Sequence, residues 1–403
     1  MSVNTLNFEQ VSTVLTSIVQ QATGQAVLTP TDTGSFVSVA QMALRADRDS
    51  VMNAISNVIG RTIFSIRPYS SKMDGLMMDT FRWGAVMRKL SIADSDWKDD
   101  PAYEWPALFD STQTPPTGDG EAIDPWTIKK PNILQTNFYG SSVYFDEMTI
   151  FEDQLETAFQ GPDQLGSFLS LIMTNLSNRL ELSNEALKRG LVANAIGAII
   201  DEGQTDRVVH LLTEYNALTG LSLTAQTVYQ PVNFAPFMKW VYSRVENISG
   251  LMTEMSTAFQ TVITNKPVLR HTPAQFQNVY LFAPTRQQFD ARVLADTYHD
   301  SYLNTANVET VNFWQSIATP DTVNVTPSYV DNSGVLVNPA SPVSQDGVMG
   351  IIFDRDMMGM TLLDQRVLST PLNTKGLYRN LHVHCKQRVV FDNTEKGVVL
   401  LLD

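Results

Sequence analysis

Apolar residues recur at helical spacing along one long stretch in the middle of the chain, DQLGSFLSLIMTNLSNRLELSNEALKRGLVANAIGAIIDEG. They fall at i, i+3, i+4, i+7 and i+11, and these positions are Leu165, Phe168, Leu169, Ile172 and Leu176. Gly161 opens a helix-start signal before the stretch, and Gly203 follows it as a stop. The pattern predicts one helix over about 163–202, on the order of 60 Å long. A helix of that length is a spine that joins distant parts of a molecule.

Shorter patterns predict three further elements. The first thirty residues contain NFEQVSTVLTSIVQQA, an amphipathic helix, and a Gly, Thr and Pro stretch follows it, so together they indicate an N-terminal arm. A second helical piece covers about 49–60, and another amphipathic helix lies near 234–256. After the spine, DRVVHLLTEY predicts a β segment.

Two strand-like runs, GAVMRKLSI and NILQTNFYGSSVYF, bracket about forty residues rich in Pro, Asp and Trp. A compact domain seldom carries a structureless insertion beyond roughly 12–15 residues unless the insertion has a task. We therefore expect residues 84–145 to form a long hairpin that projects from the body and contacts a neighbouring molecule through Trp97, Trp105 and Trp126. A surface loop without such a contact is the alternative.

In the second half of the chain, short strand and helix patterns replace the long helical pattern. NVYLFAPTRQQFDARVLADTYHDSYL reads as strand, turn and helix, and a Val, Thr and Pro-rich region with alternating VMGIIFDRDMMGMTLL follows it. We assign about 270–365 to a second, α/β-like lobe. Residues 366–403 return to long strands, RVLSTPL, LYRNLHVHCKQRVVF and GVVLLL, separated by turns.

Composition narrows the class of protein. With 403 residues, 43% hydrophobic and 17% charged, the chain is an ordinary globular protein with two or three lobes. A net charge of −14 opposes general binding to nucleic acid, although an acidic chain can still enclose DNA. A single cysteine excludes an internal disulfide framework, and neither an export signal nor a membrane span is evident, so we expect folding in the cytoplasm.

One candidate for metal binding is His382-Val383-His384-Cys385. Side chains alternate along a strand, so His382 and His384 point to one face, whereas Cys385 points to the other with Leu381 and Val383. An i, i+2 histidine pair can bind Zn²⁺, but a site needs three or four ligands. No other histidine stands at ligand-like spacing, so we interpret the pair as solvated or hydrogen-bonded histidines and expect no metal and no cofactor.

A candidate for catalysis is Asp32-Thr33-Gly34-Ser35, the signature of aspartic proteases, whose chemistry needs two carboxylates that share a proton. Only one copy is present, and Thr, Asp and Gly are also turn residues. An acidic run lacks the glycine at the sixth position of an EF-hand loop, and we read it as hydrated surface charge: Asp94, Asp96, Asp99 and Asp100. No phosphate-loop, dinucleotide, hydrolase or zincin motif occurs, so we predict no catalytic residue and no enzyme.

The order of elements, arm, hairpin, spine helix, body, inserted lobe and returning strands, resembles the major capsid protein of tailed phages. Two stretches are similar to the head protein of phi-29-type short-tailed phages. One is 131–192, PNILQTNFYGSSVYFDEMTIFEDQLETAFQGPDQLGSFLSLIMTNLSNRLELSNEALKRGLV. The other is 348–391, in which NTKGLYRN is the most specific fragment. The chain ends soon after its last strand, unlike relatives that carry an immunoglobulin-like domain at the C-terminus.

This resemblance implies an α+β chain with the Hong Kong 97 capsid fold. It implies an N-terminal arm over 1–60, an extended loop (E-loop) over 84–145 and an axial domain over 270–365. A peripheral domain would take in 61–83 and 146–269, including the spine helix, and 366–403 would return to its strands.

The resemblance also implies partners. Copies of the chain would form pentamers and hexamers of an icosahedral virion shell around double-stranded DNA, which the shell would hold without sequence-specific binding. Scaffolding, portal and decoration proteins would take part, and no membrane would. Four arginines near the arm would pair with acidic residues of neighbours or offset local negative charge: Arg45, Arg48, Arg61 and Arg67. The alternatives are an encapsulin-like compartment around a cargo protein and, from another class, an aspartic-protease-like or metal-dependent enzyme.

Overall fold

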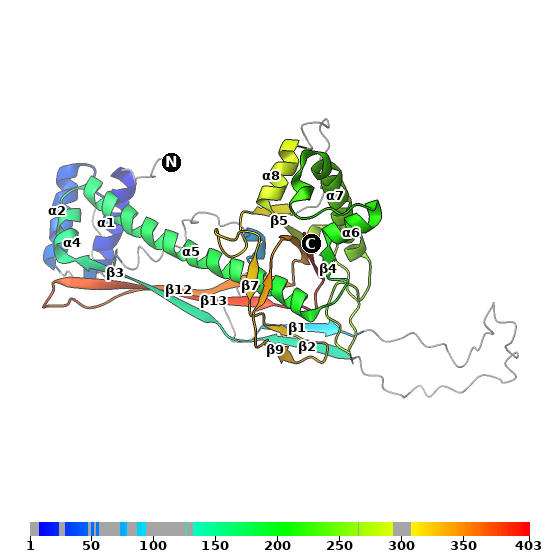
Figure 1. Ribbon diagram of the computed structural model, residues 1–403. Coiled ribbons are helices and arrows are strands. Elements are labelled where there is room, and N and C mark those ends of the chain that lie inside the picture. The colour runs from blue at the N-terminus through cyan, green and yellow to red at the C-terminus, as the bar shows by residue number, and fades with distance from the viewer. Residues whose placement is uncertain are drawn as a thin grey trace, which may run out of the picture.

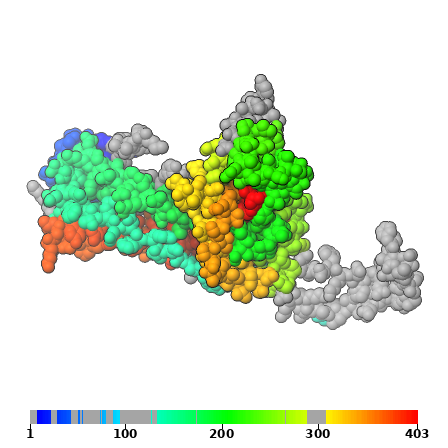
Figure 2. Space-filling view, viewed as in Figure 1, coloured from blue at the N-terminus to red at the C-terminus, as the bar shows by residue number. Residues whose placement is uncertain are grey.

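The structure is a computed structural model that describes residues 8–23, 29–46, 50–51, 54–55, 73–78, 87–93, 126, 132–264, 266–292 and 308–403. Its centre is helix α5, Pro162–Glu202, a straight element of 41 residues that runs between two lobes (Figure 1). The space-filling view shows the same two lobes joined by a narrower waist (Figure 2). At about 1.5 Å per residue the helix is roughly 60 Å long, so the predicted spine is confirmed.

The first lobe packs helices on a long antiparallel sheet. Its three strands lie in the order β12 (Met358–Ser369), β13 (Tyr378–Phe391) and β3 (Ser142–Phe151). Helices α1 (Phe8–Thr23), α2 (Thr33–Ala46) and α4 (Glu152–Ala158) cover it together with the first half of α5. Helix α1 confirms the predicted amphipathic helix near the N-terminus. The sequence did not predict α2, because its Gly and Thr residues were read as a linker.

The second lobe is built on a five-stranded mixed sheet. The strand order is β4 (Val208–His210), β14 (Gly397–Leu401), β11 (Val348–Asp354), β5 (Gln277–Phe282) and β6 (Val308–Val311). Alternate residues of these strands enter two different cores. In β11, Ile351 and Phe353 pack toward the end of α5, whereas Met349 and Ile352 pack toward α6 (Leu211–Thr219) and α7 (Pro231–Thr253). The sheet is therefore covered on both faces, with α8 (Ala283–Arg292) beside α7.

Small strand pairs complete the architecture. Strand β1 (Met87–Ile92) pairs antiparallel with β2 (Ile133–Phe138), β7 (Val323–Val325) with β10 (Val343–Gln345), and β8 (Tyr329–Val330) with β9 (Leu336–Val337). Short 3₁₀ turns lie at Asp74–Leu76, Thr227–Tyr229 and Ala274–Phe276. In the part of the chain that is described, no helix combines the length and the apolar character that crossing a membrane requires.

Three features differ from the sequence predictions. DRVVHLLTEY forms a strand only over Val208–His210, because Leu211, Leu212 and Tyr215 recur at helical spacing and begin α6. Strand β14 joins the five-stranded sheet beside β11, not the long strands with which the sequence grouped it. Helix α7 also packs on that sheet, so the lobe draws on residues from both sides of the predicted range 270–365. The predicted helical piece at 49–60 lies mostly outside the described residues.

Candidate functional site

The histidine pair lies on the open face of the three-stranded sheet. Leu381, Val383 and Cys385 are buried in the core of the first lobe, so the predicted alternation is confirmed. Burial raises the pKa of the Cys385 thiol to about 11. On the other face, the ring of Phe145 in β3 lies 6.0 Å from that of His382 and 5.8 Å from that of His384. Within the described ranges, no three His, Cys, Asp or Glu side chains are grouped as metal ligands would be.

Asp32 lies at the start of α2 and acts as its N-terminal cap. Its Oδ1 accepts a hydrogen bond from the Ser35 amide at 2.6 Å, and the Asp32 amide donates to Ser35 Oγ at 3.2 Å. Hydrogen bonds from the backbone amide and the side chain of Ser35 hold the pKa of the Asp32 carboxyl below its usual value. The protease-like motif is thus a reciprocal capping arrangement.

Several other predicted residues fall outside the described residues: Asp94, Asp96, Asp99, Asp100, Trp97, Trp105, Arg48, Arg61 and Arg67. Arg45 belongs to α2, and its side chain is not described. Trp126 is 85% exposed.

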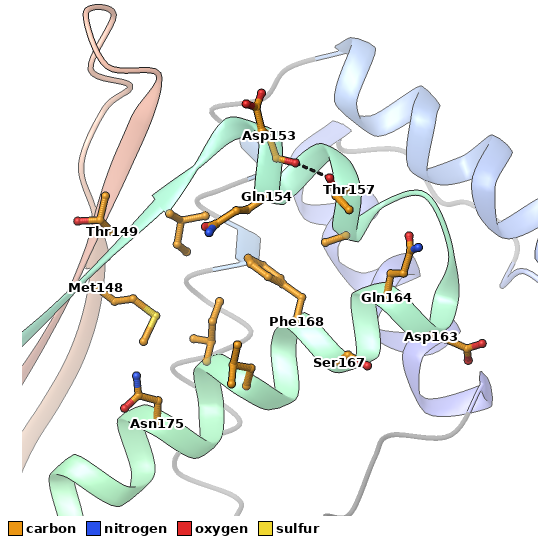
Figure 3. Close-up of a pocket in the computed structure, with 14 residues that line it drawn as sticks. Met148, Thr149, Asp153, Gln154, Thr157, Asp163, Gln164, Ser167, Phe168 and Asn175 are labelled. Atoms are coloured by element: carbon orange, nitrogen blue, oxygen red, sulfur yellow. Dashed lines mark hydrogen bonds between the residues drawn. The ribbon is translucent and has the colours of Figure 1, made fainter.

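An open groove of about 820 Å³ lies between β3, α4 and α5 (Figure 3). Met148 of β3 and Phe168 of α5 point into it, and Ile150, Leu171 and Ile172 add apolar surface. Strand β3 is an edge of its sheet, so its side away from β13 pairs with no other strand in the described structure. An apolar groove beside a free strand edge suits an extended peptide, which can add a strand and bury alternate side chains.

The rim of this groove is acidic. Asp153 of α4 and Asp163 of α5 line it, and their carboxylates point outward in Figure 3. None of its fourteen lining residues is Lys or Arg. The groove therefore favours a segment that combines apolar residues with a positive charge.

The β1–β2 pair, which we call the ribbon, offers such a segment. Strands alternate, and Arg88, Leu90 and Ile92 point away from the body. Leu90 is 62% exposed and Ile92 72% exposed, and Ile133 stands opposite Ile92 on the neighbouring strand. The outer face of the ribbon thus carries apolar residues and one positive charge, beside the amide side chains of Gln135 and Asn137.

The inner face of the ribbon carries a charged cluster. Lys89 Nζ donates to Asp392 Oδ2 at 2.6 Å and also to Glu395 Oε1, while Arg270 donates to Glu395 and to Ser91 Oγ. Burial alone would raise the pKa of Asp392, but Lys89 and the hydrogen bond from Thr394 outweigh it and hold that pKa below its usual value. Burial has the larger effect at Glu395 and raises its pKa.

Comparison with known families identifies the chain. The sequence profile of the family described as Phi29-like phage major capsid protein matches residues 15–400. The chain belongs to this family. This capsid protein has no significant match among curated proteins.

One solved capsid structure resembles it in fold, and two further phage structures match more weakly. The capsid structure of Staphylococcus phage Andhra matches with a TM-score of 0.50 at 9% identity, covering 83% of this capsid protein and 85% of that chain. The structure of head fiber and inner core protein gp22 of native bacteriophage P68 matches with a TM-score of 0.49 at 9% identity, covering 83% of this capsid protein and 86% of that chain. The capsid structure of the Cyanophage P-SCSP1u matches with a TM-score of 0.43 at 12% identity, covering 83% of this capsid protein and 89% of that chain. The mixed α/β architecture fits a capsid fold of the Hong Kong 97 type, and the family match does not favour the encapsulin-like or enzymatic alternatives.

Sequence reasoning missed the groove and the charged cluster of this capsid protein. Both unite residues that are far apart in the chain, such as Lys89 and Asp392, and no local spacing signals such a contact. The alternation in the ribbon was detectable, because Leu90 and Ile92 alternate with Lys89 and Ser91 in GAVMRKLSI.

Proposed function

We propose that this capsid protein assembles with copies of itself, as pentamers and hexamers, into an icosahedral shell that encloses double-stranded DNA. The match of the capsid family profile to residues 15–400 carries this proposal. Its role is structural and not enzymatic. Supporting this, Asp32 caps a helix, and the histidine pair flanks Phe145.

The parts of the chain take the roles that the resemblance implies. Residues 1–60 form the arm, and 84–145, which include the ribbon, form the E-loop. The lobe with the three-stranded sheet is the peripheral domain, and the lobe with the five-stranded sheet is the axial domain. The strand order supports moving β14 into the axial domain, and the core that α7 shares with the five-stranded sheet supports moving α7 there.

The proposed contact between copies joins the ribbon of one copy to the groove of its neighbour. Strand β1 would lie along the free edge of β3, with Leu90 and Ile92 in the apolar floor. Arg88 would face Asp153 and Asp163 on the rim. Both strand edges are open in the described structure, and the charges are opposite. Each contact is weak alone, but a closed shell multiplies it.

A charge swap tests this contact. We expect Arg88→Glu to abolish shells, seen by electron microscopy and sedimentation, because the introduced carboxylate would face the acidic rim. Adding Asp153→Lys and Asp163→Lys should restore them, since opposite charges again meet. Lys239→Glu, an exposed reversal on α7, is the control and should assemble normally. Shells that form with Arg88→Glu alone would refute the contact, and a parent chain that never assembles would refute the shell.

The contents of the shell separate its two possible uses. We propose packaged DNA, with scaffolding, portal and decoration proteins as partners and assembly in the host cytoplasm. A net charge of −14 supports a wall that contains DNA without gripping it. Nuclease-protected DNA inside shells from infected cells supports this function, whereas a protein cargo without DNA would favour an encapsulin-like compartment.

A further inference from the structure

The ribbon is attached to the body without an apolar core. Among the described residues, no side chain of β1 or β2 belongs to any of the three core clusters. Met87, Leu134 and Phe138 are only half-buried, and Leu90 and Ile92 face outward. The ribbon is therefore held against the body mainly by polar contacts.

Most of those polar contacts converge on one turn of the body, and Lys266 Nζ adds a hydrogen bond to the Ile133 carbonyl at 2.6 Å. Lys89 and Ser91, which alternate with the outward residues, meet the turn between β13 and β14 and the segment before β5. The groups that face Lys89 are Asp392 and Glu395, and Arg270 faces Glu395 from the other side. Asp392 and Glu395 are 2% and 7% exposed at their side chains, whereas Lys89 is 22% exposed. The carboxylates belong to the body, and the ammonium group belongs to the ribbon.

A glycine with a positive φ lies at the end of the ribbon that leads into β3. Gly140 separates β2 from β3 with a φ of +84°, a conformation that side chains with a Cβ rarely adopt. Nothing lies within 4 Å of the position that a Cβ would take there. Arg388 Nε donates to the Gly140 carbonyl at 2.8 Å. Gly140 can therefore change its backbone angles more readily than a residue with a Cβ, once the Arg388 hydrogen bond is released.

We propose that Lys89, Arg270, Asp392 and Glu395 form a charge latch that fixes the ribbon, and that opening it frees the ribbon to turn at Gly140 while all three cores stay intact. When the latch opens, water can solvate the ammonium and carboxylate groups. Separating an apolar interface would instead expose hydrophobic surface. Arg270 and Arg207 remain near the carboxylates after Lys89 leaves, so the body keeps cations that offset their charge.

The use of the latch rests on the proposed function. Copies in an icosahedral shell meet neighbours at several angles, and a ribbon that turns as a unit can reach the same groove from each of them. The latch itself does not depend on assembly and can be measured on the unassembled full-length chain.

Hydrogen exchange of Lys89→Met tests the latch. We expect amides of 87–92 and 133–138 to exchange faster by on the order of tenfold to a hundredfold, because a two-stranded ribbon released from the body is only marginally stable and its β1–β2 hydrogen bonds open more often. Amides of β5 and β11 in the body should keep the parent rates. Arg88→Met is the matched control, since Arg88 is the next residue on the outer face, and it should leave the ribbon amides unchanged. Lys89→Arg, which keeps the charge, should restore much of the protection.

Two outcomes would overturn the latch. One is that the ribbon amides of Lys89→Met exchange hydrogen at the same rate as those of the parent. The other is faster exchange in β5 and β11 as well, which would make the cluster part of the body's core. If Lys89→Met does not fold, the triple variant Lys89→Met, Asp392→Asn, Glu395→Gln removes the unpaired charges and must show the same ribbon-only effect. Shell formation is scored separately, so loss of shells with an intact latch would count against the proposed function alone.

Discussion

At the scale of single residues, the structure explains two motifs that suggested chemistry. Asp32 and Ser35 exchange hydrogen bonds at the start of α2, and a single sequence cannot distinguish this cap from one half of a protease site. His382 and His384 share a face because strands alternate, which the sequence did predict. What it could not predict is that Phe145, distant in sequence, lies beside both rings.

Lys396 is a buried residue whose role emerges only from the structure. It is fully buried, and its ammonium group donates to the Glu254 carbonyl at 2.8 Å, the Ser256 hydroxyl at 3.0 Å and the Met252 carbonyl at 3.3 Å. Burial lowers its pKa, against the opposing effect of Asp354 and Glu254. Because carbonyls at the end of α7 have no later turn to bond, a cation there satisfies them.

We expect Lys396→Met to destabilise the second lobe by about 2 to 3 kcal/mol, because these carbonyls would lose charged donors in a buried place. The measurement is the denaturation midpoint of the unassembled chain. Lys375→Met, at an exposed turn, is the control and should leave the free energy of unfolding within about 0.5 kcal/mol of the parent value. An unchanged midpoint for Lys396→Met would show that these carbonyls do not need the ammonium group.

At the scale of elements, long periodic patterns were predictable and interrupted ones were not. The spine was expected over 163–202 and spans 162–202, because its apolar stripe and its Gly161 and Gly203 boundaries are local signals. Helix α2 was missed because Gly34 and the threonines before it favour a turn. The pairing of β14 with β4 and β11 depends on contacts between distant segments, which one sequence does not reveal.

The spine helix contains two glycines that should respond in opposite ways to alanine. At Gly197 an added Cβ would come within 2.5 Å of Val325 Cγ1, so the helix and β7 approach too closely for a side chain. At Gly190, which is exposed, nothing lies within 4 Å of that position. We expect Gly197→Ala to destabilise the chain by about 1 to 3 kcal/mol and Gly190→Ala to stabilise it by roughly 0.5 to 1 kcal/mol.

Thermal unfolding of the two variants side by side checks this expectation, since each serves as the control for the other. Equal shifts of the same sign would show that helix propensity alone determines both effects. Opposite shifts would establish that Gly197 is needed for the close contact with β7.

At the scale of the whole molecule, α5 belongs to two separate cores. Its first part contributes to the core under α1 and α2, with Leu165 and Leu176 at its ends, and its last part, from Leu191, contributes to the core of the five-stranded sheet. Between Leu176 and Leu191 no described hydrophobic side chain of the helix is buried. The two lobes are thus joined by one helix and the long strands, while each has its own apolar interior.

This division predicts that a core mutation acts on one lobe. Leu165→Ala should cost about 2 to 5 kcal/mol and speed hydrogen exchange in α1, α4 and the first half of α5, because it leaves a cavity in the first core. Amides of β5 and β11 should stay protected. Ile351→Ala, in the second core, should give the reverse pattern. Faster exchange in both lobes for each variant would mean that the molecule unfolds as one unit.

The helix and the long sheet also lie side by side across the waist, and polar contacts connect them. Arg179 Nη1 of α5 meets Asp146 Oδ1 of β3 at 2.6 Å, and Gln387 of β13 donates to Asn184 of α5. Two elements fastened along their length resist bending more than either does alone. In the wall of a shell that is pushed outward from inside, α5 and the long sheet would keep their shape. The deformation would then fall mainly on the ribbons and the turns.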